Sequence, residues 1–189
     1  MVKRMTACAA VLGVCLCVWA GDPSEKGVPT SPLTIYSGGF GVGASHPLNE
    51  ELKGVQPNFL KLTFANTVFF TDNLAVFFDA DWFLPGSNFG ADLGFDFMLV
   101  NKGAFRPFVG AGIGAHYFDK GNKFGEDLGP SGTAHIGFTI DLSDRVQMRM
   151  RVPYHLVGGE VIDHCIGLEA GFLFSNQFRH VKKLDYNRL

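Results

Sequence analysis

Residues 146–156 read VQMRMRVPYHL, and apolar and polar side chains alternate along the whole stretch. A period of two is typical of a β-strand, because successive side chains leave opposite faces. The face from Val146 to Leu156 is uncharged, whereas Arg149 and Arg151 lie on the other face. An uncharged face eleven residues long spans the hydrocarbon of a bilayer when the strand is tilted. The stretch therefore predicts a strand of a membrane barrel, with its polar face turned to the lumen.

The same alternation recurs in seven further segments, less regularly in the first two. They are Leu33–Ser45, Leu60–Phe70, Leu74–Leu84, Phe89–Leu99, Phe105–Tyr117, Ala134–Leu142 and Ile162–Phe174. An even number of strands, each about ten residues long, is typical of bacterial single-chain barrels. We therefore expect an all-β fold, an eight-stranded antiparallel up-and-down transmembrane β-barrel.

The connections between these segments differ in length according to their parity. The tight ones follow the second, fourth and sixth segments, at residues 71–73, 101–103 and 143–145. The longer or more turn-rich ones follow the first, third and fifth, at residues 46–58, 85–88 and 119–132. Outer-membrane barrels carry short periplasmic turns and longer extracellular loops. The parity predicts that both ends of the barrel chain face the periplasm.

The chain begins with features of an export signal. Lys3 and Arg4 precede an apolar run that closes on Val18-Trp19-Ala20, a small-residue cleavage site. We expect residues 1–20 to be removed, leaving a periplasmic segment at 21–32, the barrel at 33–175 and a periplasmic tail at 176–189. Cys165 is then the only cysteine left, so no internal disulfide forms. Lipidation is not favoured, because no cysteine combines a preceding small residue with an apolar run ahead of it.

Composition narrows the function classes. The formal charge moves from −2 to −4 when Lys3 and Arg4 leave with the signal, so nucleic acid is not an expected partner. No internal stretch reaches the roughly 18 apolar residues of a membrane helix. An exported, phenylalanine-rich chain of this kind leaves a closed barrel as the main option. We expect a monomer in the cell outer membrane, with the lipid bilayer and the barrel assembly machinery as partners and no cofactor.

The inward face holds many ionisable side chains. The predicted lumen charge network consists of Lys61, Asp79, Asp81, Asp92, Asp96, Arg106, Asp141, Arg149, Arg151, Asp163 and Glu169, and His116, His135 and His155 share that face. An eight-stranded barrel has an interior just wide enough to be filled by side chains. The charges therefore either pair and plug the lumen, or line a narrow conduit whose selectivity Arg149 and Arg151 set.

The sequence shows no catalytic or metal-binding pattern of residues. Ser45 and His46 are adjacent on one strand and point apart, so they do not form a nucleophile and base pair. No histidines show a ligand spacing such as His-x-x-x-His. The glycine pattern from Gly39 to Ala44 lies inside a strand rather than before a helix, so it does not predict a nucleotide site. We expect neither an enzyme nor a metal site.

Three stretches resemble small outer-membrane β-barrel proteins of the OmpA transmembrane-domain and OmpW/OprG type. They are the FTDNLA turn at 70–75, the RPFVGAGIG strand at 106–114 and the GFLF segment at 171–174. Resemblance to the OmpW type implies diffusion of small hydrophobic solutes, and resemblance to the OmpA type implies anchoring and surface interactions with a plugged lumen.

The sequence thus leaves several functions open. We predict a narrow channel or permeability protein for small solutes. The alternative is a structural or adhesive surface protein with a plugged lumen, whose loops bind host ligands. A more distant alternative is a soluble lipocalin-like barrel, in which the apolar faces would point inward.

Overall fold

The computed structural model describes residues 35–71, 73–100, 103–121, 127–143, 145–159 and 161–175. All of these residues belong to one compact unit, Leu33–Leu189. The predicted signal peptide at 1–20, the segment at 21–32 and the tail at 176–189 lie outside the described residues and stay predictions.

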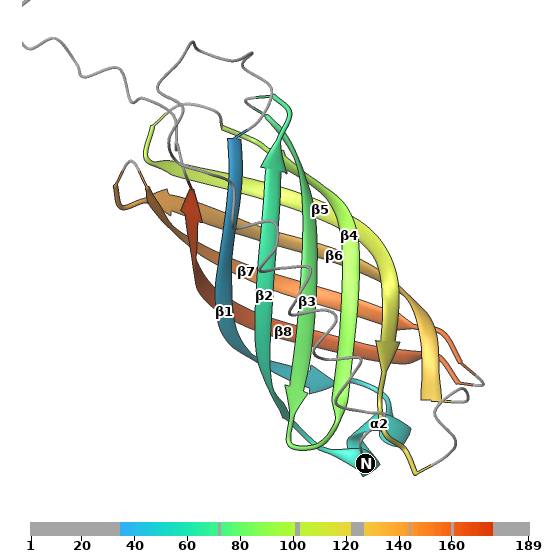
Figure 1. Ribbon diagram of the computed structural model, residues 1–189. Coiled ribbons are helices and arrows are strands. Elements are labelled where there is room, and N and C mark those ends of the chain that lie inside the picture. Colours follow the sequence, from blue (N-terminus) through green and yellow to red (C-terminus); the bar gives the residue numbers. More distant parts are fainter. Residues whose placement is uncertain are drawn as a thin grey trace, which may run out of the picture. The chain divides into compact units, whose positions relative to one another are not determined.

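Eight antiparallel strands close into a single barrel in which each strand pairs with its neighbours in sequence and β1 pairs with β8. Figure 1 shows this up-and-down order. The strands are β1 (Ile35–Pro47), β2 (Phe59–Phe69), β3 (Leu74–Leu84), β4 (Asn88–Met98), β5 (Phe105–Tyr117), β6 (Leu128–Asp141), β7 (Val146–Val157) and β8 (Asp163–Ser175). The predicted fold class is confirmed.

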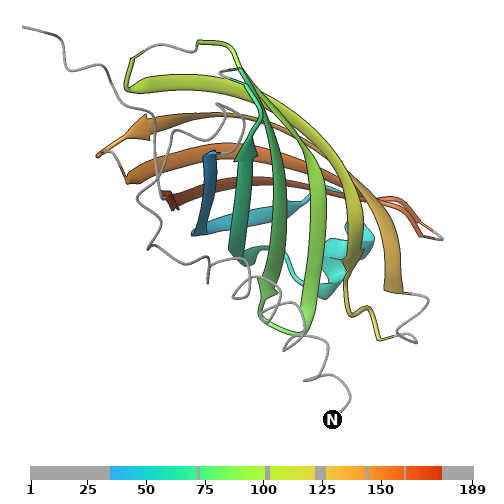
Figure 2. The ribbon, with the colours of Figure 1, turned by 45° about the horizontal axis from the view of Figure 1, so that its top comes forward.

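The strands are tilted, and those on opposite walls cross at a steep angle (Figure 2), as the closure of a barrel requires. One short helix, α2 (Glu50–Val55), lies in the connection between β1 and β2. Within the part of the chain that the structure describes, no helix has the length and hydropathy needed to cross a membrane.

Most strand boundaries agree with the sequence prediction to within two residues, and β6 is the exception. Residues 119–132 were expected to form a loop, but β6 begins at Leu128 and pairs with β5 from that point. The prediction is wrong because Gly129 and Pro130 are turn-forming residue types. Pro130 lies beyond the Ser131–Val157 pair that ends the ladder with β7, a position near a sheet margin where proline is tolerated.

The outer and inner faces of the wall have opposite chemistry. Along β4 the outward residues Leu93, Phe95 and Phe97 are 50–58% exposed, whereas the inward Asp92 and Asp96 are at most 2% exposed. A soluble protein buries its apolar face instead. The soluble lipocalin-like alternative is contradicted, because the phenylalanine-rich faces point outward and the charges point inward.

The one polar exception on the outer face of β2 has a local partner. Asn66 falls on the outward parity, where a polar side chain is costly in lipid. The Tyr36 hydroxyl donates a hydrogen bond of 2.6 Å to its side-chain oxygen. The two residues lie side by side on β2 and β1 and so satisfy each other.

We call the two ends of the barrel the loop end and the turn end. The loop end carries α2 and the connections from β1 to β2, β3 to β4, β5 to β6 and β7 to β8, and Figure 1 shows α2 at the same end as the connection from β3 to β4. The turn end carries the connections from β2 to β3, β4 to β5 and β6 to β7.

Each end of the lumen contains a buried apolar cluster. The loop-end apolar cluster consists of Leu52, Phe59, Phe83, Phe118, Val157 and Cys165. The turn-end apolar cluster consists of Phe69, Ala75, Met98 and Phe108. The polar part of the lumen lies between these two clusters, and it is there that most of the predicted charge network is found.

Candidate functional site

The middle of the lumen is filled by charged side chains from five strands. We call this set the central ionic network, and it consists of Lys61, Asp79, Asp81, Asp92, Asp96, Arg149, Arg151 and Glu169, each at most 5% exposed. The inward parity of β2, β3, β4, β7 and β8 brings them together. Since charges out of bulk water must be paired or hydrated, their partners determine what the lumen can do.

Arg151 of β7 links two walls of the barrel. Its guanidinium donates to both carboxylate oxygens of Glu169, at 3.0 Å from Nε and 3.1 Å from the terminal nitrogen. The other terminal nitrogen donates to Asp79 of β3. A guanidinium shared by two carboxylates in this way is geometrically specific, so Arg151 fixes the distance between β3 and the β7–β8 pair.

Lys61 of β2 connects the same acids from another side. Its ammonium lies 2.8 Å from Asp81 and 3.2 Å from Glu169. The Thr63 hydroxyl lies 2.7 Å from a carboxylate oxygen of Asp81 and 2.9 Å from one of Glu169. Thr63 has the same parity as Lys61, but the sequence did not identify it as a bridge, because a threonine on a strand carries no distinguishing signal.

Arg149 pairs with a different acid, nearer the turn end. It donates to Asp96 at 2.7 Å, and the other oxygen of Asp96 lies 2.7 Å from Nε2 of His135. The Arg149 guanidinium also lies over the Phe108 ring, 4.9 Å from its centroid. This cation–π contact joins the ionic network to the turn-end apolar cluster.

Inward glycines make room for the rings of the network. A Cβ on Gly110 would lie 2.2 Å from Nε2 of His135, and one on Gly90 would lie 2.0 Å from the ring of His116. No side chain fits at either position unless the ring moves. The glycines thus allow a bore this narrow to hold imidazole rings.

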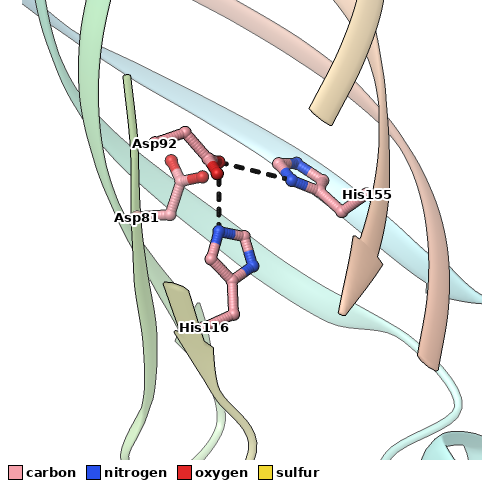
Figure 3. Close-up of side chains that lie close together, drawn as sticks. All are labelled: Asp81, Asp92, His116 and His155. Atoms are coloured by element: carbon pink, nitrogen blue, oxygen red, sulfur yellow. Dashed lines mark hydrogen bonds and ion pairs between the residues drawn. The ribbon is translucent and has the colours of Figure 1, made fainter. Parts of the chain in front are cut away.

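Asp92 of β4 differs from the other acids because its nearest partners are histidines. Its Oδ2 lies 3.0 Å from Nε2 of His116 and 3.5 Å from Nδ1 of His155, as Figure 3 shows. The Ser131 hydroxyl donates to its other oxygen at 3.0 Å. Together with Asp81, these side chains place four possible metal-ligand atoms within 4.8 Å of one another.

Three of the predicted lumen residues lie apart from the central ionic network. Arg106 and Asp141 pair with each other at 2.5 Å near the turn end, where Gln147 also donates to Asp141. Asp163 lies at the loop end and pairs with Lys120 at 2.8 Å. Eight of the eleven predicted residues thus form the central ionic network, two form a separate pair near the turn end, and Asp163 pairs with a lysine outside the predicted set.

Lys120 was missed by the sequence reasoning because it lies in a connection, where strand parity gives no orientation. Its ammonium also contacts Glu51 of α2, at 3.2 Å. Burial alone would lower the pKa of Lys120, but the hydrogen bonds that its ammonium donates to Asp163 and Glu51 outweigh this effect and raise the pKa above its usual range. Lys120 therefore stays charged and ties the first and third connections of the loop end to β8.

Asn49 adds to this organisation of the loop end. Its side-chain nitrogen donates to Asp163 at 2.9 Å, and its side-chain oxygen accepts from the backbone nitrogen of His164 at 3.3 Å. The backbone of Leu48 also donates to the carbonyl of His164. The first connection is thus held against the start of β8 by several independent bonds.

Neither a protein-family model nor a curated protein matches this sequence. Among solved structures, neisserial surface protein A superimposes with a TM-score of 0.54 at 9% identity, over 77% of this chain and 97% of that one. The N-terminal β-barrel domain of Pseudomonas aeruginosa OprF gives 0.52 at 14% identity, over 75% and 99%. A de novo designed transmembrane β-barrel gives 0.52 at 12%, over 77% and 98%.

At these identities the likeness concerns the fold alone. Two of the three similar structures are natural barrels, one described as a surface protein and one as a barrel domain, and the third was designed to cross a membrane. Each superposition covers at least 97% of the similar structure, so these proteins match this chain over nearly their whole length. The chain therefore has the fold of a small transmembrane β-barrel with eight antiparallel strands, as its sequence predicted.

Proposed function

We propose that this chain is an outer-membrane protein with a sealed lumen, which acts at the cell surface as a structural or adhesive element. Its loop end would be the functional surface, and its lumen would hold the barrel rigid. The proposal rests above all on one observation, the closure of the lumen by an ionic layer between two apolar clusters.

The sealing layers are continuous along the lumen. From the loop end, the Phe59, Phe83 and Phe118 rings pack together at centroid distances of 5.2–6.0 Å. The central ionic network follows, and the turn-end apolar cluster lies beyond it. A conduit needs sites that ions or solutes enter and leave readily. Side chains that are paired with one another and at most 5% exposed do not offer such sites.

The outer wall supports a membrane location. Large apolar side chains on every strand from β1 to β8 are exposed, among them Ile113 at 75% and Ile136 at 62%. An apolar band of this kind around a closed barrel is typical of outer-membrane proteins. The unequal connections favour an orientation with the loop end outside the cell and both strand termini in the periplasm.

Hydrogen bonds and ion pairs connect the segments of the loop end. Lys120, Asn49 and Asp163 connect three of its segments, and the backbone of Asp119 donates to Asn88 at 2.7 Å. Such bonds hold the connections in a defined arrangement, which lowers the entropy cost of binding a partner. Host or matrix ligands at this end are the partners that we propose.

The competing function is the narrow channel for small solutes, and conductance separates the two. The full chain would be folded into a planar bilayer, with folding checked by heat-dependent electrophoretic mobility. We expect a silent barrel. Discrete openings whose size changes when Arg149 and Arg151 are both replaced by Gln would overturn the proposal in favour of the channel.

The location and orientation have their own test. We propose that Lys53, which is half-buried on α2, is reachable from outside the cell. Expressed in a Gram-negative host, a Lys53→Cys variant should react with a membrane-impermeant maleimide in intact cells. The control is Ser143→Cys at the turn end, which should react only after the outer membrane is opened. The reverse pattern would refute the orientation.

A further inference from the structure

We propose that Asp92, His116 and His155, with Asp81 as a fourth ligand, form a binding site for a divalent transition-metal ion in the lumen. The two imidazoles and two carboxylates come from β3, β4, β5 and β7 (Figure 3). A ligand set of two nitrogens and two oxygens favours Zn²⁺ among the common divalent ions. The inference concerns a site inside the lumen and does not depend on the function proposed for the loop end.

The spacing of the ligand atoms matches a tetrahedral ion. Zinc bonds of about 2.0–2.1 Å place neighbouring ligand atoms about 3.3 Å apart. The contacts of Asp92 with His116 and His155, at 3.0 Å and 3.5 Å, lie on either side of that value. All four ligand atoms lie within 4.8 Å of one another, so the widest pair has to close by about 1.5 Å.

The charge of the surroundings also favours a cation. The central ionic network holds five acids against three permanent cations, Lys61, Arg149 and Arg151. Four of the acids have one of these cations as an ion-pair partner, and within the described residues Asp92 has only histidines. Asp92 also lies directly across the strand pair from Asp79, where like charges destabilise a sheet. A divalent ion at Asp92 would balance the excess of two negative charges.

Hydrogen bonding leaves the histidines incompletely satisfied. His155 is 2% exposed and His116 is fully buried, yet the Nδ1 atom of each has no hydrogen-bond partner among the described residues. The Nδ1 atom of His155 is the one that faces Asp92. A buried nitrogen without a hydrogen bond costs free energy, and coordination of a metal by the Nδ1 atom of His155 would remove that cost.

Lys61 is the natural competitor of the ion. Its ammonium lies 3.4 Å from Nε2 of His155 and 2.8 Å from Asp81. When Nδ1 of His155 binds a metal, Nε2 carries the ring proton and no longer accepts from Lys61. The ammonium then keeps its carboxylate partners, Glu169 among them at 3.2 Å. Removing Lys61 should therefore strengthen metal binding, which a purely structural histidine pair does not predict.

The test uses the full chain without an affinity tag, folded in detergent micelles and stripped of metal. Co²⁺ is the probe, because tetrahedral coordination gives visible absorption bands, and Zn²⁺ should displace it at one equivalent. Replacing both site histidines by Ala, or Asp92 by Asn, should weaken binding by more than about 100-fold, beyond the loss typical of outer-shell partners. Asp92→Asn keeps the shape of the side chain, so it covers the case in which the histidine variant does not fold.

His135 provides the matched control. It is also a buried inward histidine with its Nε2 on an aspartate, Asp96, but Arg149 already neutralises that acid. His135→Ala should keep the cobalt spectrum and the affinity, and Lys61→Gln should raise the affinity at least tenfold. The proposal is overturned by a folded wild-type protein that gives no tetrahedral cobalt spectrum, or by binding that Asp92→Asn leaves unchanged.

Discussion

Arg151 offers the sharpest test of how the lumen holds the barrel together. Replacing it by Met keeps most of the side-chain volume and removes three hydrogen bonds, two to Glu169 and one to Asp79. Glu169 keeps Lys61 at 3.2 Å, but Asp79 loses its ion-pair partner and is 2% exposed. Breaking a buried pair on one side costs about 3–5 kcal/mol, and we expect Arg151→Met to destabilise the barrel by that amount.

A second substitution separates the orphaned charge from lost packing. Asp79→Asn alone should cost about 1–3 kcal/mol, since one charged hydrogen bond is weakened while Arg151 keeps Glu169. In the Arg151→Met background the same change removes the unpaired charge. The double variant should therefore be more stable than Arg151→Met by about 1–3 kcal/mol. Because Asp79→Asn alone is destabilising, the two substitutions are then non-additive, as is expected of residues in direct contact.

The assay is guanidinium unfolding of the protein folded into phosphatidylcholine vesicles, followed by the fluorescence of Trp82. That side chain is 47% exposed on the outer wall, so its emission should change when it leaves the lipid. Arg145→Met is the control, because Arg145 is an exposed residue just before the same strand. Equal midpoints for Arg151→Met and Arg145→Met, or no rescue by Asp79→Asn, would refute the reasoning.

Three further predictions follow from the wall, the glycines and the loop end. Leu93 and Leu99 are equally exposed, at 54% and 56%, but Leu93 lies at the middle of β4 and Leu99 just after its end. In vesicle unfolding, Leu93→Arg should therefore destabilise the barrel by about 2–4 kcal/mol and Leu99→Arg by about 0–1 kcal/mol. Equal destabilisation by the two variants would contradict a position of Leu93 at the bilayer midplane. Gly110→Ala should destabilise the barrel by about 1–3 kcal/mol through overpacking against His135, whereas Gly132→Ala, whose Cβ meets no atom within 4 Å, should have no such effect in the same assay. The carboxylate partners of Lys120 raise its pKa despite burial, so Lys120 should hold the loop end in order up to the usual lysine value of 10.5 and lose this effect only at higher pH. The NMR signal of the Asn49 side-chain amide should report the loss. A transition already complete below pH 10.5, or one that is unchanged in Lys120→Met, would contradict the prediction.

The alternation of apolar and polar residues predicted most of the strands and the face on which their side chains lie. The alternation of β7 placed Arg149 and Arg151 on one face and the methionines on the other, and the structure has them so. Parity is a local property of an extended chain, so it is readable wherever a strand is regular. The start of β6 was missed because Gly129 and Pro130 are turn-forming types that here belong to a strand.

The sequence did not predict which of the charged side chains in the lumen pair with one another. The tilt and stagger of the strands in the closed barrel determine which acid pairs with which arginine. A local sequence pattern predicts neither the tilt nor the stagger. The grouping of Asp92 with His116 and His155 is an example. The expected absence of a metal site rested on ligand spacing along the chain, whereas these side chains come from three different strands.

Asp92 shows that closure of the lumen does not account for every residue in it. An aspartate whose only task was to fill the bore could be an asparagine, which would keep the bond from Ser131 without burying a charge. The other acids of the network each pair with a permanent cation that compensates the carboxylate charge; they are Asp79, Asp81, Asp96 and Glu169. Asp92 has two buried imidazoles whose ring centroids lie 4.9 Å apart, and an imidazole is not a permanent cation as a guanidinium is. A carboxylate at this position would be compensated by a bound metal ion, and His116 and His155 are the side chains that would coordinate that ion with Asp92.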